Sequence, residues 1–496
     1  MLSACSINSG QQAETLLDMP TLDYIGSPTD DDLQGELTIL VPSYRGTLIN
    51  NDLRIYANFF TELHPNVTIN FEGYELGFPV EMSQHIAVIT NLIANPPDMV
   101  FFQNTISFEK TQHEAIFADL NAFIDGPRGI DRSKLFDNIL RAAEIRGGLF
   151  HLPFYVDFEA VFLNQRLFYG IGVDTSEIYT LTIDQELDYF VRISEAFADE
   201  DIFYSRQFSL MQIMERSILY NIDTRDVFAN TPNMHQRLEL AMQVPKAEFV
   251  RGEAMHMTES SLVNFAPEGA IAYRSTFLPD AMRSIFLGRS TNMMWSFDWM
   301  QGGYHLLFLA QHPNMQFSHP VFKTEESGGI RFTSSSNYAI MRNAARPDLA
   351  WEFLRFILEF EENLFFVRTQ QNQNPIVYHF ARGGLPINRA RFENQVRAVL
   401  HRELLYTLRS TNIGRYIGTN DQEHFYNPQD ASRYVVDVAM DFLRTGMNML
   451  DQEVRISQAV FHTLVYPDIW LLYSGQQDVA RTLANIQNRL ELYVHE

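Results

Sequence analysis

The sequence predicts an α/β fold in two domains. A chain of 496 residues exceeds what one hydrophobic core usually supports, so two cores are expected. An apolar fraction of 46% and an aromatic fraction of 13% are typical of a folded protein. Short apolar runs alternate with amphipathic helical segments, which is the pattern of parallel sheets covered by helices.

The first strand–helix–strand unit begins at Glu36. Residues 37–41 form an apolar run suited to a buried strand, and residues 67–71 alternate as a strand does. Because such a crossover is right-handed and connects parallel strands, the unit predicts a parallel sheet. The helix between them starts at Asp52, and its predicted apolar face comprises Leu53, Tyr56, Phe60 and Leu63.

The same alternation continues through a second helix and a third strand at 98–102. The apolar positions of that helix are Ile86, Ile89, Leu92 and Ile93. A second α/β block follows residue 153, with a strand at 159–164 and a helix that ends at Phe197. Thr182 and Gln185 have the spacing of a capping box that opens this helix.

The later part of the chain returns to the same elements. Residues 331–340 predict a strand, 347–360 an amphipathic helix, and the segment after Gly475 a final helix. The serines at 334–336 are interpreted as a loop that hydrogen-bonds locally, and not as a nucleophile.

The charge of the chain argues against two classes of partner. A net charge of −24 repels nucleic acid and anionic membrane surfaces. No run of about 18 apolar residues occurs between residues 20 and 496, so no membrane-spanning helix is expected there and the body is predicted to be soluble.

The sequence predicts no catalytic residue, metal or cofactor. It contains no Gly-rich phosphate loop, nucleophile elbow or His-Glu-x-x-His zinc motif. The 14 histidines are scattered without metal-ligand spacing, and a single cysteine excludes a disulfide framework.

That cysteine, Cys5, stands at the end of Leu-Ser-Ala-Cys. Small residues before a cysteine are what a lipoprotein signal peptidase requires, so Cys5 is predicted to be a lipid-attachment point. Residues 1–35 are then a lipobox remnant and a flexible tether, and everything after them lies in solution outside the cell membrane.

Six separated segments occur in a recognisable order: FFTELHPNV at 59–67, PDMVFF at 97–102, AIFADL at 115–120, GLFHLP at 148–153, AWEFLRFI at 350–357 and GGLPI at 383–387. Together they resemble the family 1 extracellular solute-binding proteins of bacteria, the group that includes maltose-binding protein.

The resemblance implies a two-lobed periplasmic-binding-protein-like fold, in which hinge strands join two α/β lobes and a cleft between them holds the ligand. One lobe would comprise 36–153 plus 331–395, and the other 154–330 plus 396–496. Such a protein works as a monomer, closes around its ligand and delivers it to the permease of an ABC importer. Region 396–460 is longer than in the family and matches it poorly.

Candidate ligand residues follow from the rule that ligands bind at the carboxyl ends of strands in open α/β sheets. Ser43, Tyr44 and Arg45 follow the first strand; Phe102, Gln103 and Asn104 follow the third; and Phe154, Tyr155 and Asp157 lie at the first crossover. The resemblance adds Asp298 and Trp299, with Trp295 as the alternative register, from the segment that supplies a sugar-stacking tryptophan.

Each candidate also has a structural interpretation. Phe102 and Phe154 are equally suited to a core, one helix would bury both tryptophans, and Arg45 or Asp157 would pair on the surface.

A cleft that combines aromatic rings with Asn, Gln, Asp and Arg favours an oligosaccharide as the ligand. The alternatives are a peptide or cationic solute, an exported carbohydrate-active enzyme, and a surface scaffold.

Overall fold

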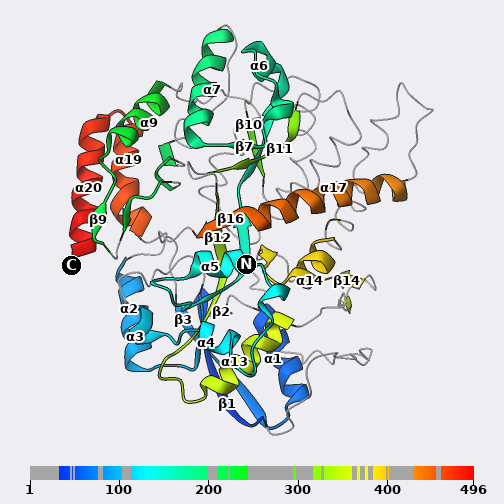
Figure 1. Cartoon of the computed structure of the whole chain (residues 1–496). Coiled ribbons are helices and arrows are strands. Elements are labelled where there is room, and N and C mark those ends of the chain that lie inside the picture. Colours follow the sequence, from blue (N-terminus) through cyan, green and yellow to red (C-terminus); the bar gives the residue numbers. More distant parts are fainter. Residues whose placement is uncertain are drawn as a thin grey trace, which may run out of the picture.

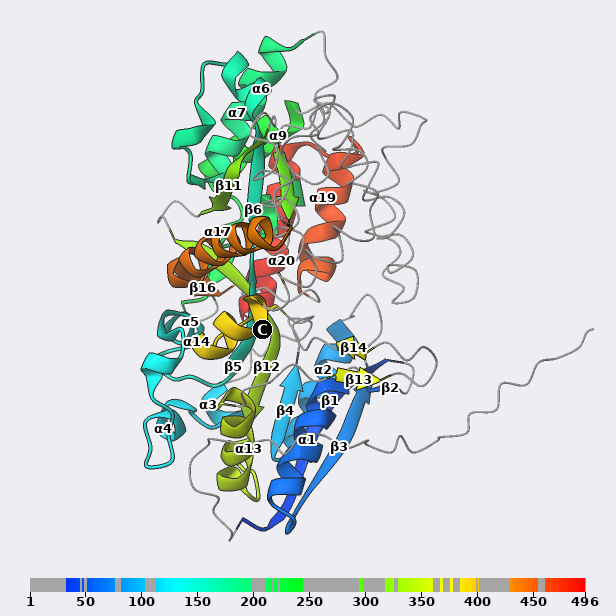
Figure 2. The same cartoon turned by 90° about the vertical axis from the view of Figure 1, so that its right-hand side faces the viewer.

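The chain forms two α/β lobes, which lie one above the other in Figures 1 and 2. The predicted α/β class with two lobes is confirmed. No described helix is long and apolar enough to cross a bilayer. The computed structural model describes residues 33–44, 47–48, 51–75, 82–102, 113–198, 210–211, 213–215, 217–221, 224–243, 294–297, 317–324, 329–359, 366–368, 375–377, 384–397, 400, 428–453 and 460–495.

The larger lobe is built on an 8-stranded sheet in the order β15-β5-β12-β4-β1-β2, with β3 paired to β1 and β16 to β12. β1 runs parallel to both β3 and β4, which confirms the predicted parallel unit. The strands are β1 (Gly35–Tyr44), β2 (Thr47–Leu48), β3 (Val67–Glu75), β4 (Met99–Phe102), β5 (Leu152–Phe158), β12 (Ile330–Ile340), β15 (Leu385–Pro386) and β16 (Leu450–Glu453).

Helices of the larger lobe cover this sheet, and β13 (Phe366–Arg368) pairs with β14 (Pro375–Val377) in a separate hairpin. The helical segments are α1 (Asn51–Leu63), α2 (Met82–Ala94), α3 (His113–Ile116), α4 (Asn121–Ile124), η1 (Arg132–Lys134), α5 (Asp137–Ala143), α13 (Pro347–Glu359), α14 (Arg389–Arg391), η4 (Phe392–Val396) and α17 (Pro428–Met449).

Two predicted apolar faces need correction. Leu53, Tyr56 and Phe60 of α1 are buried as expected, but Leu63 at the end of the helix is exposed. In α2 both Ile86 and Ile93 are exposed, whereas Val88 and Leu92 pack against the sheet. α2 is apolar on more than one side, so its sequence does not specify which side faces the core.

The smaller lobe contains a 4-stranded sheet in the order β10-β6-β11-β7 and a short β8–β9 ribbon. The predicted capping box is present, since Thr182 and Gln185 bond reciprocally at the start of α7. The elements are β6 (Ala160–Asn164), β7 (Thr180–Leu181), β8 (Tyr220–Asn221), β9 (Asp226–Val227), β10 (Met294–Phe297), β11 (Phe317–Lys323), α6 (Gln165–Gly170), η2 (Thr175–Glu177), α7 (Ile183–Ala196), α9 (Pro232–Gln243), η6 (Phe461–Val465), α19 (Tyr466–Tyr473) and α20 (Val479–His495).

Among the described elements the chain passes between the lobes three times, from β5 to β6, from β11 to β12, and from β16 to η6. The third passage corrects the predicted assignment of 396–496 to the second lobe. β16 pairs with β12, and Met440, Leu443 and Met447 of α17 lie in the core of the larger lobe. Of the described residues in that range, 428–453 therefore pack with the larger lobe and 460–495 with the smaller one.

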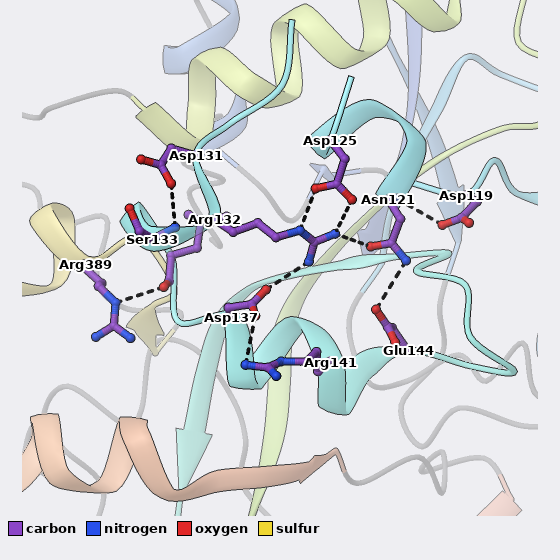
Figure 3. A network of polar contacts seen from close by, with 11 residues as sticks. Asp119, Asn121, Asp125, Asp131, Arg132, Ser133, Asp137, Arg141, Glu144 and Arg389 are labelled. Atoms are coloured by element: carbon purple, nitrogen blue, oxygen red, sulfur yellow. Dashed lines mark hydrogen bonds and ion pairs between the residues drawn. The ribbon is translucent and has the colours of Figure 1, made fainter. Parts of the chain in front are cut away.

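A polar network secures the segment that leads into β5 (Figure 3). The Arg132 guanidinium donates to Asp125 Oδ1 at 2.7 Å and to Asn121 Oδ1 at 2.7 Å. Asp119 Oδ1 accepts from the backbone N–H groups of Asn121 at 3.0 Å and of Leu149 at 2.9 Å. Because every donor and acceptor named has a protein partner, the network is explained by its structural role.

A buried ion pair links β11 to α7 beside the first passage. Lys323 Nζ lies 3.6 Å from Glu186 Oε2, and their side chains are 2% and 1% exposed. Glu159, the residue between β5 and β6, approaches the same ammonium group at 3.3 Å. The pair therefore stabilises the lobe at the point where the chain enters it.

We expect Lys323→Met to lower the free energy of unfolding by about 3–5 kcal/mol, because it leaves the Glu186 carboxylate buried without its cation. The matched control is Lys134→Met, since Lys134 pairs with Glu359 at 3.5 Å but is 59% exposed. That control should change stability by roughly 0–1 kcal/mol. Urea unfolding of both variants measures the difference, and equal losses would contradict this account.

Candidate functional site

The carboxyl ends of three parallel strands meet at one edge of the larger sheet. β1 lies between β3 and β4, and the three strands end at Tyr44, Glu75 and Phe102. In Figure 2 their arrowheads point toward the smaller lobe. Because ligands of open α/β sheets bind at such edges, this edge is the candidate site.

Polar groups already lie at this edge. Ser43 is 4% exposed, and its Oγ donates to Glu75 Oε1 at 2.8 Å. Glu75 itself is exposed. A carboxylate that is held by a neighbour and open to water is suited to accept hydrogen bonds from a ligand.

On one of its two long edges, the central strand β12 has a gap between two partner strands. On that edge β16 pairs with residues 330–332 and β4 pairs with residues 337–340. β5 occupies the opposite edge of β12. Consequently, no described strand pairs with residues 333–336 on the first edge, so backbone polar groups there need other partners.

The side chains of this stretch are polar although they are buried. Ser334, Ser336 and Asn337 are 2%, 8% and 4% exposed. Ser334 Oγ donates to the Tyr155 carbonyl at 3.3 Å. The expectation that serines 334–336 form a loop is therefore wrong: they lie inside β12, where a backbone acceptor compensates the burial of Ser334.

Aromatic side chains pack the chain segments of the first two passages between the lobes against α17. The rings of Phe322 (β11) and Phe442 (α17) stack at 4.2 Å between centroids, only 3° from parallel. Phe158 at the end of β5 lies 5.8 Å from Phe322. Gly446 permits this packing, because a Cβ there would lie 2.4 Å from Phe158 Cζ.

The described residues offer no cluster of three His, Cys, Asp or Glu side chains that could hold a metal ion. One carboxyl group near the passages is nevertheless perturbed. Burial, and then the Glu159 carboxylate, raise the pKa of Glu215 from 4.5 to about 7. The backbone carbonyl of Glu215 accepts from Arg331 Nη1 at 3.2 Å, a contact between β12 and the smaller lobe.

Several predicted ligand residues cannot be placed. Arg45, Gln103, Asn104, Asp298 and Trp299, like Cys5, lie outside the described residues.

The backbones of two others are placed. Tyr44 ends β1 and pairs with Thr47. Trp295 lies in strand β10 opposite Phe162, and not in a helix.

The predicted aromatic residues near the crossover lie in cores. Phe102 is 5% exposed and stacks on Phe117, with ring centroids 6.5 Å apart. The Arg391 guanidinium lies 5.1 Å from the Phe154 ring centroid, and its Nη2 donates to the Tyr155 hydroxyl at 2.7 Å. Core contacts account for the burial of all three rings, and their contact with a ligand stays a prediction.

Asp157 is only half-buried, on β5 opposite Thr333. Asp157 therefore lies on the β5 side of β12. Residues 333–336 of β12 lack a described strand partner on the opposite side.

Sequence reasoning missed Glu75 and Asn337. The available signal for Asn337 was a polar run within the otherwise apolar predicted strand 331–340, where buried polar side chains need an explanation. Glu75 follows the predicted strand at 67–71, and the longer β3 carries it to the edge.

The smaller lobe presents an aromatic row on α19. Tyr466, Trp470 and Tyr473 share one helical face, with ring centroids 6.4 Å and 5.5 Å apart in succession. Trp470 is 44% exposed, which is unusual for so large an aromatic side chain.

No protein-family model matches the sequence, and no curated protein matches it. Solved structures that resemble the chain include an extracellular solute-binding protein family 1 member from Alicyclobacillus acidocaldarius, at 13% identity and TM-score 0.48, covering 93% of this chain and 99% of that one. A sugar transporter from Rhizobium etli shows 13% identity and TM-score 0.49, covering 92% and 99%.

An ABC substrate-binding protein from Listeria monocytogenes in complex with cycloalternan shows 13% identity and TM-score 0.46, covering 93% and 99%. The first of the three bears the name of the family that the sequence segments resemble. Because the identities and TM-scores are this low, the fold assignment rests on the sheet topology itself.

Glu215 should make stability depend on pH. Between about pH 4.5 and 7 the folded chain holds more protons on Glu215 than the unfolded chain does, so stability falls as pH rises through this window. Protein atoms crowd the Glu215 carboxyl group, but the residue as a whole stays partly open to water, so screening reduces the effect.

Relative to the native chain, Glu215→Gln should raise the melting temperature more at pH 8 than at pH 5. Glu195→Gln, an exposed position on α7, is the control and should show no such difference. A pH-independent effect of Glu215→Gln would contradict the raised pKa.

Proposed function

We propose that this chain is the extracellular solute-binding subunit of an ABC importer, which captures a small ligand between its lobes and delivers it to a membrane permease. The observation that carries the proposal is the polar edge at the ends of β1, β3 and β4, which points toward a second lobe joined by three passages. A ligand that contacts both lobes favours the closed arrangement, because only differential affinity shifts such an equilibrium.

An oligosaccharide is the proposed ligand. Glu75 and the buried polar residues of β12 supply hydrogen-bonding groups on one lobe. The row of Tyr466, Trp470 and Tyr473 supplies flat rings on the other, on which the C–H faces of sugar rings stack. A net charge of −24 disfavours anionic ligands, whereas a peptide or cationic solute is the alternative.

The remaining assignments belong to the same proposal. Cys5 would anchor the chain to the outer face of the cell membrane through a lipid, and the lobes would meet near residues 153 and 331. Phe102, Phe154, Tyr155 and Asp157 stay proposed ligand residues, together with Tyr44, Arg45, Gln103, Asn104, Trp295, Asp298 and Trp299.

A panel of neutral oligosaccharides, read by tryptophan fluorescence and thermal shift, tests the function. At least one sugar should raise the melting temperature and, in small-angle scattering, reduce the radius of gyration by closing the lobes. Prolonged incubation with that sugar should yield no product, whereas turnover would indicate a carbohydrate-active enzyme. Binding without compaction would contradict hinge closure, and binding only to peptides or polyamines would replace the sugar.

Trp470→Ala should weaken binding of that sugar several-fold, because stacking on an exposed ring contributes roughly 1 kcal/mol. Stability should change by less than about 1 kcal/mol, since 44% of the residue is exposed. Leu492→Ala, which removes a side chain from a residue 64% exposed on α20, is the control and should leave affinity unchanged. If the native chain, Trp470→Ala and Leu492→Ala bind the sugar with equal affinity, the aromatic row is not part of the binding site.

A further inference from the structure

The amide of Asn337 is buried with one polar atom unsatisfied. The residue is 4% exposed, and its Oδ1 accepts no hydrogen bond from the described chain. Its Nδ2 faces the Ser334 carbonyl at 3.5 Å. Rotating the amide would set two oxygen atoms against each other, so the free group is an acceptor.

The position of Asn337 connects this acceptor with the candidate site. Asn337 pairs with Phe102, the last residue of β4, on one edge of β12 and with Pro153 on the other. It directly follows residues 333–336, which no described strand covers on the β4 edge. Asn337 therefore lies at the level where β4 ends, and residues 333–336 lead from it toward the passage at the start of β12.

A buried acceptor without a donor costs stability, and native proteins rarely leave one without a reason. Ser334 illustrates the usual solution, since its hydroxyl reaches the Tyr155 carbonyl at 3.3 Å. Asn388, another buried asparagine, uses both ends of its amide: Nδ2 donates to the Leu358 carbonyl at 2.9 Å, and Oδ1 accepts from the Arg391 N–H at 3.0 Å. Asn337 differs from both because its acceptor is left for a group from outside the described chain.

We infer that Asn337 is a specificity-determining residue whose Oδ1 accepts a hydrogen bond from a hydroxyl group of the bound ligand. The inference rests on the proposed solute-binding function and deepens it. An ionised carboxylate or a fully ionised phosphate has no proton to donate and is rejected at this position, whereas a sugar hydroxyl donates to Oδ1 and still accepts from other groups. A site built to accept a hydrogen bond discriminates strongly against a ligand that lacks the donor.

The test compares Asn337→Leu with the matched control Asn388→Leu. Asn337→Leu should leave the melting temperature nearly unchanged, because it removes an unsatisfied acceptor and only the long 3.5 Å hydrogen bond from Nδ2 to the Ser334 carbonyl. Asn388→Leu removes two good bonds and should lower the melting temperature by several degrees. Affinity for the sugar identified in the panel should fall at least about tenfold in Asn337→Leu and stay near the native value in Asn388→Leu.

A second comparison uses the deoxy analogues of that sugar. One analogue should lose affinity for the native chain by roughly the same factor and show no further loss with Asn337→Leu, because the variant and the analogue remove the same hydrogen bond. If the leucine variant aggregates, Asn337→Ala takes its place in both measurements.

The outcomes are distinguishable. If the native chain binds no sugar, the proposed sugar-binding function fails and this inference with it. If the native chain binds and Asn337→Leu binds equally well, only the inference is overturned, and a water molecule satisfies the amide. A melting temperature that falls in Asn337→Leu as far as in Asn388→Leu also overturns it, since Oδ1 would then have a protein partner.

Discussion

β12 is the strand on which the rest of the structure depends. It pairs with β5 along one edge and with β16 and then β4 along the other, and β11 delivers the chain to it from the smaller lobe. Because β16 and β4 do not meet, the sheet is continuous on one edge of β12 and interrupted on the other at residues 333–336. The interruption places polar backbone and side-chain groups at the boundary between the lobes, where an uninterrupted strand would have used them for pairing.

The passages between the lobes are held by two different kinds of interaction. The parallel rings of Phe322 and Phe442 at 4.2 Å, with Phe158 beside them, can slide and tilt at little cost because dispersion is non-directional. The Lys323–Glu186 pair is buried and directional, and it lies within the smaller lobe. The buried ion pair therefore lies inside a lobe, whereas the stacked rings and the exposed Arg331–Glu215 hydrogen bond lie between the lobes, where contacts must adapt if a hinge moves.

Much of the fold could be predicted from the sequence, because its signals are local. The strands around 37–41, 67–71 and 98–102, the capping box at Thr182 and the final helix each depend on spacing within one element, and each is present. The position of residues 428–453 could not be predicted this way, since it depends on β16 pairing with β12 across more than a hundred residues. The site was harder still. Phe154 and Tyr155 pack around Arg391, which their sequence positions do not reveal, and the place of Asn337 beside the gap depends on where β16 and β4 both end.

The hydrogen-bonding groups at the candidate site restrict the chemical class of the ligand more than the amino-acid composition of the chain does. Glu75 and the Oδ1 of Asn337 both accept hydrogen bonds, so a ligand that satisfies them must bring donors. Ammonium groups and hydroxyls both donate, but they differ in the cost of leaving water. An ammonium group against the buried Asn337 would lose its hydration without gaining a counter-charge, since the amide is neutral. A hydroxyl loses far less, and it offers its own lone pairs to the backbone N–H groups of an interrupted strand. The exposed carboxylate tolerates either group, whereas the buried amide favours the uncharged one, and this preference supports the proposed sugar ligand.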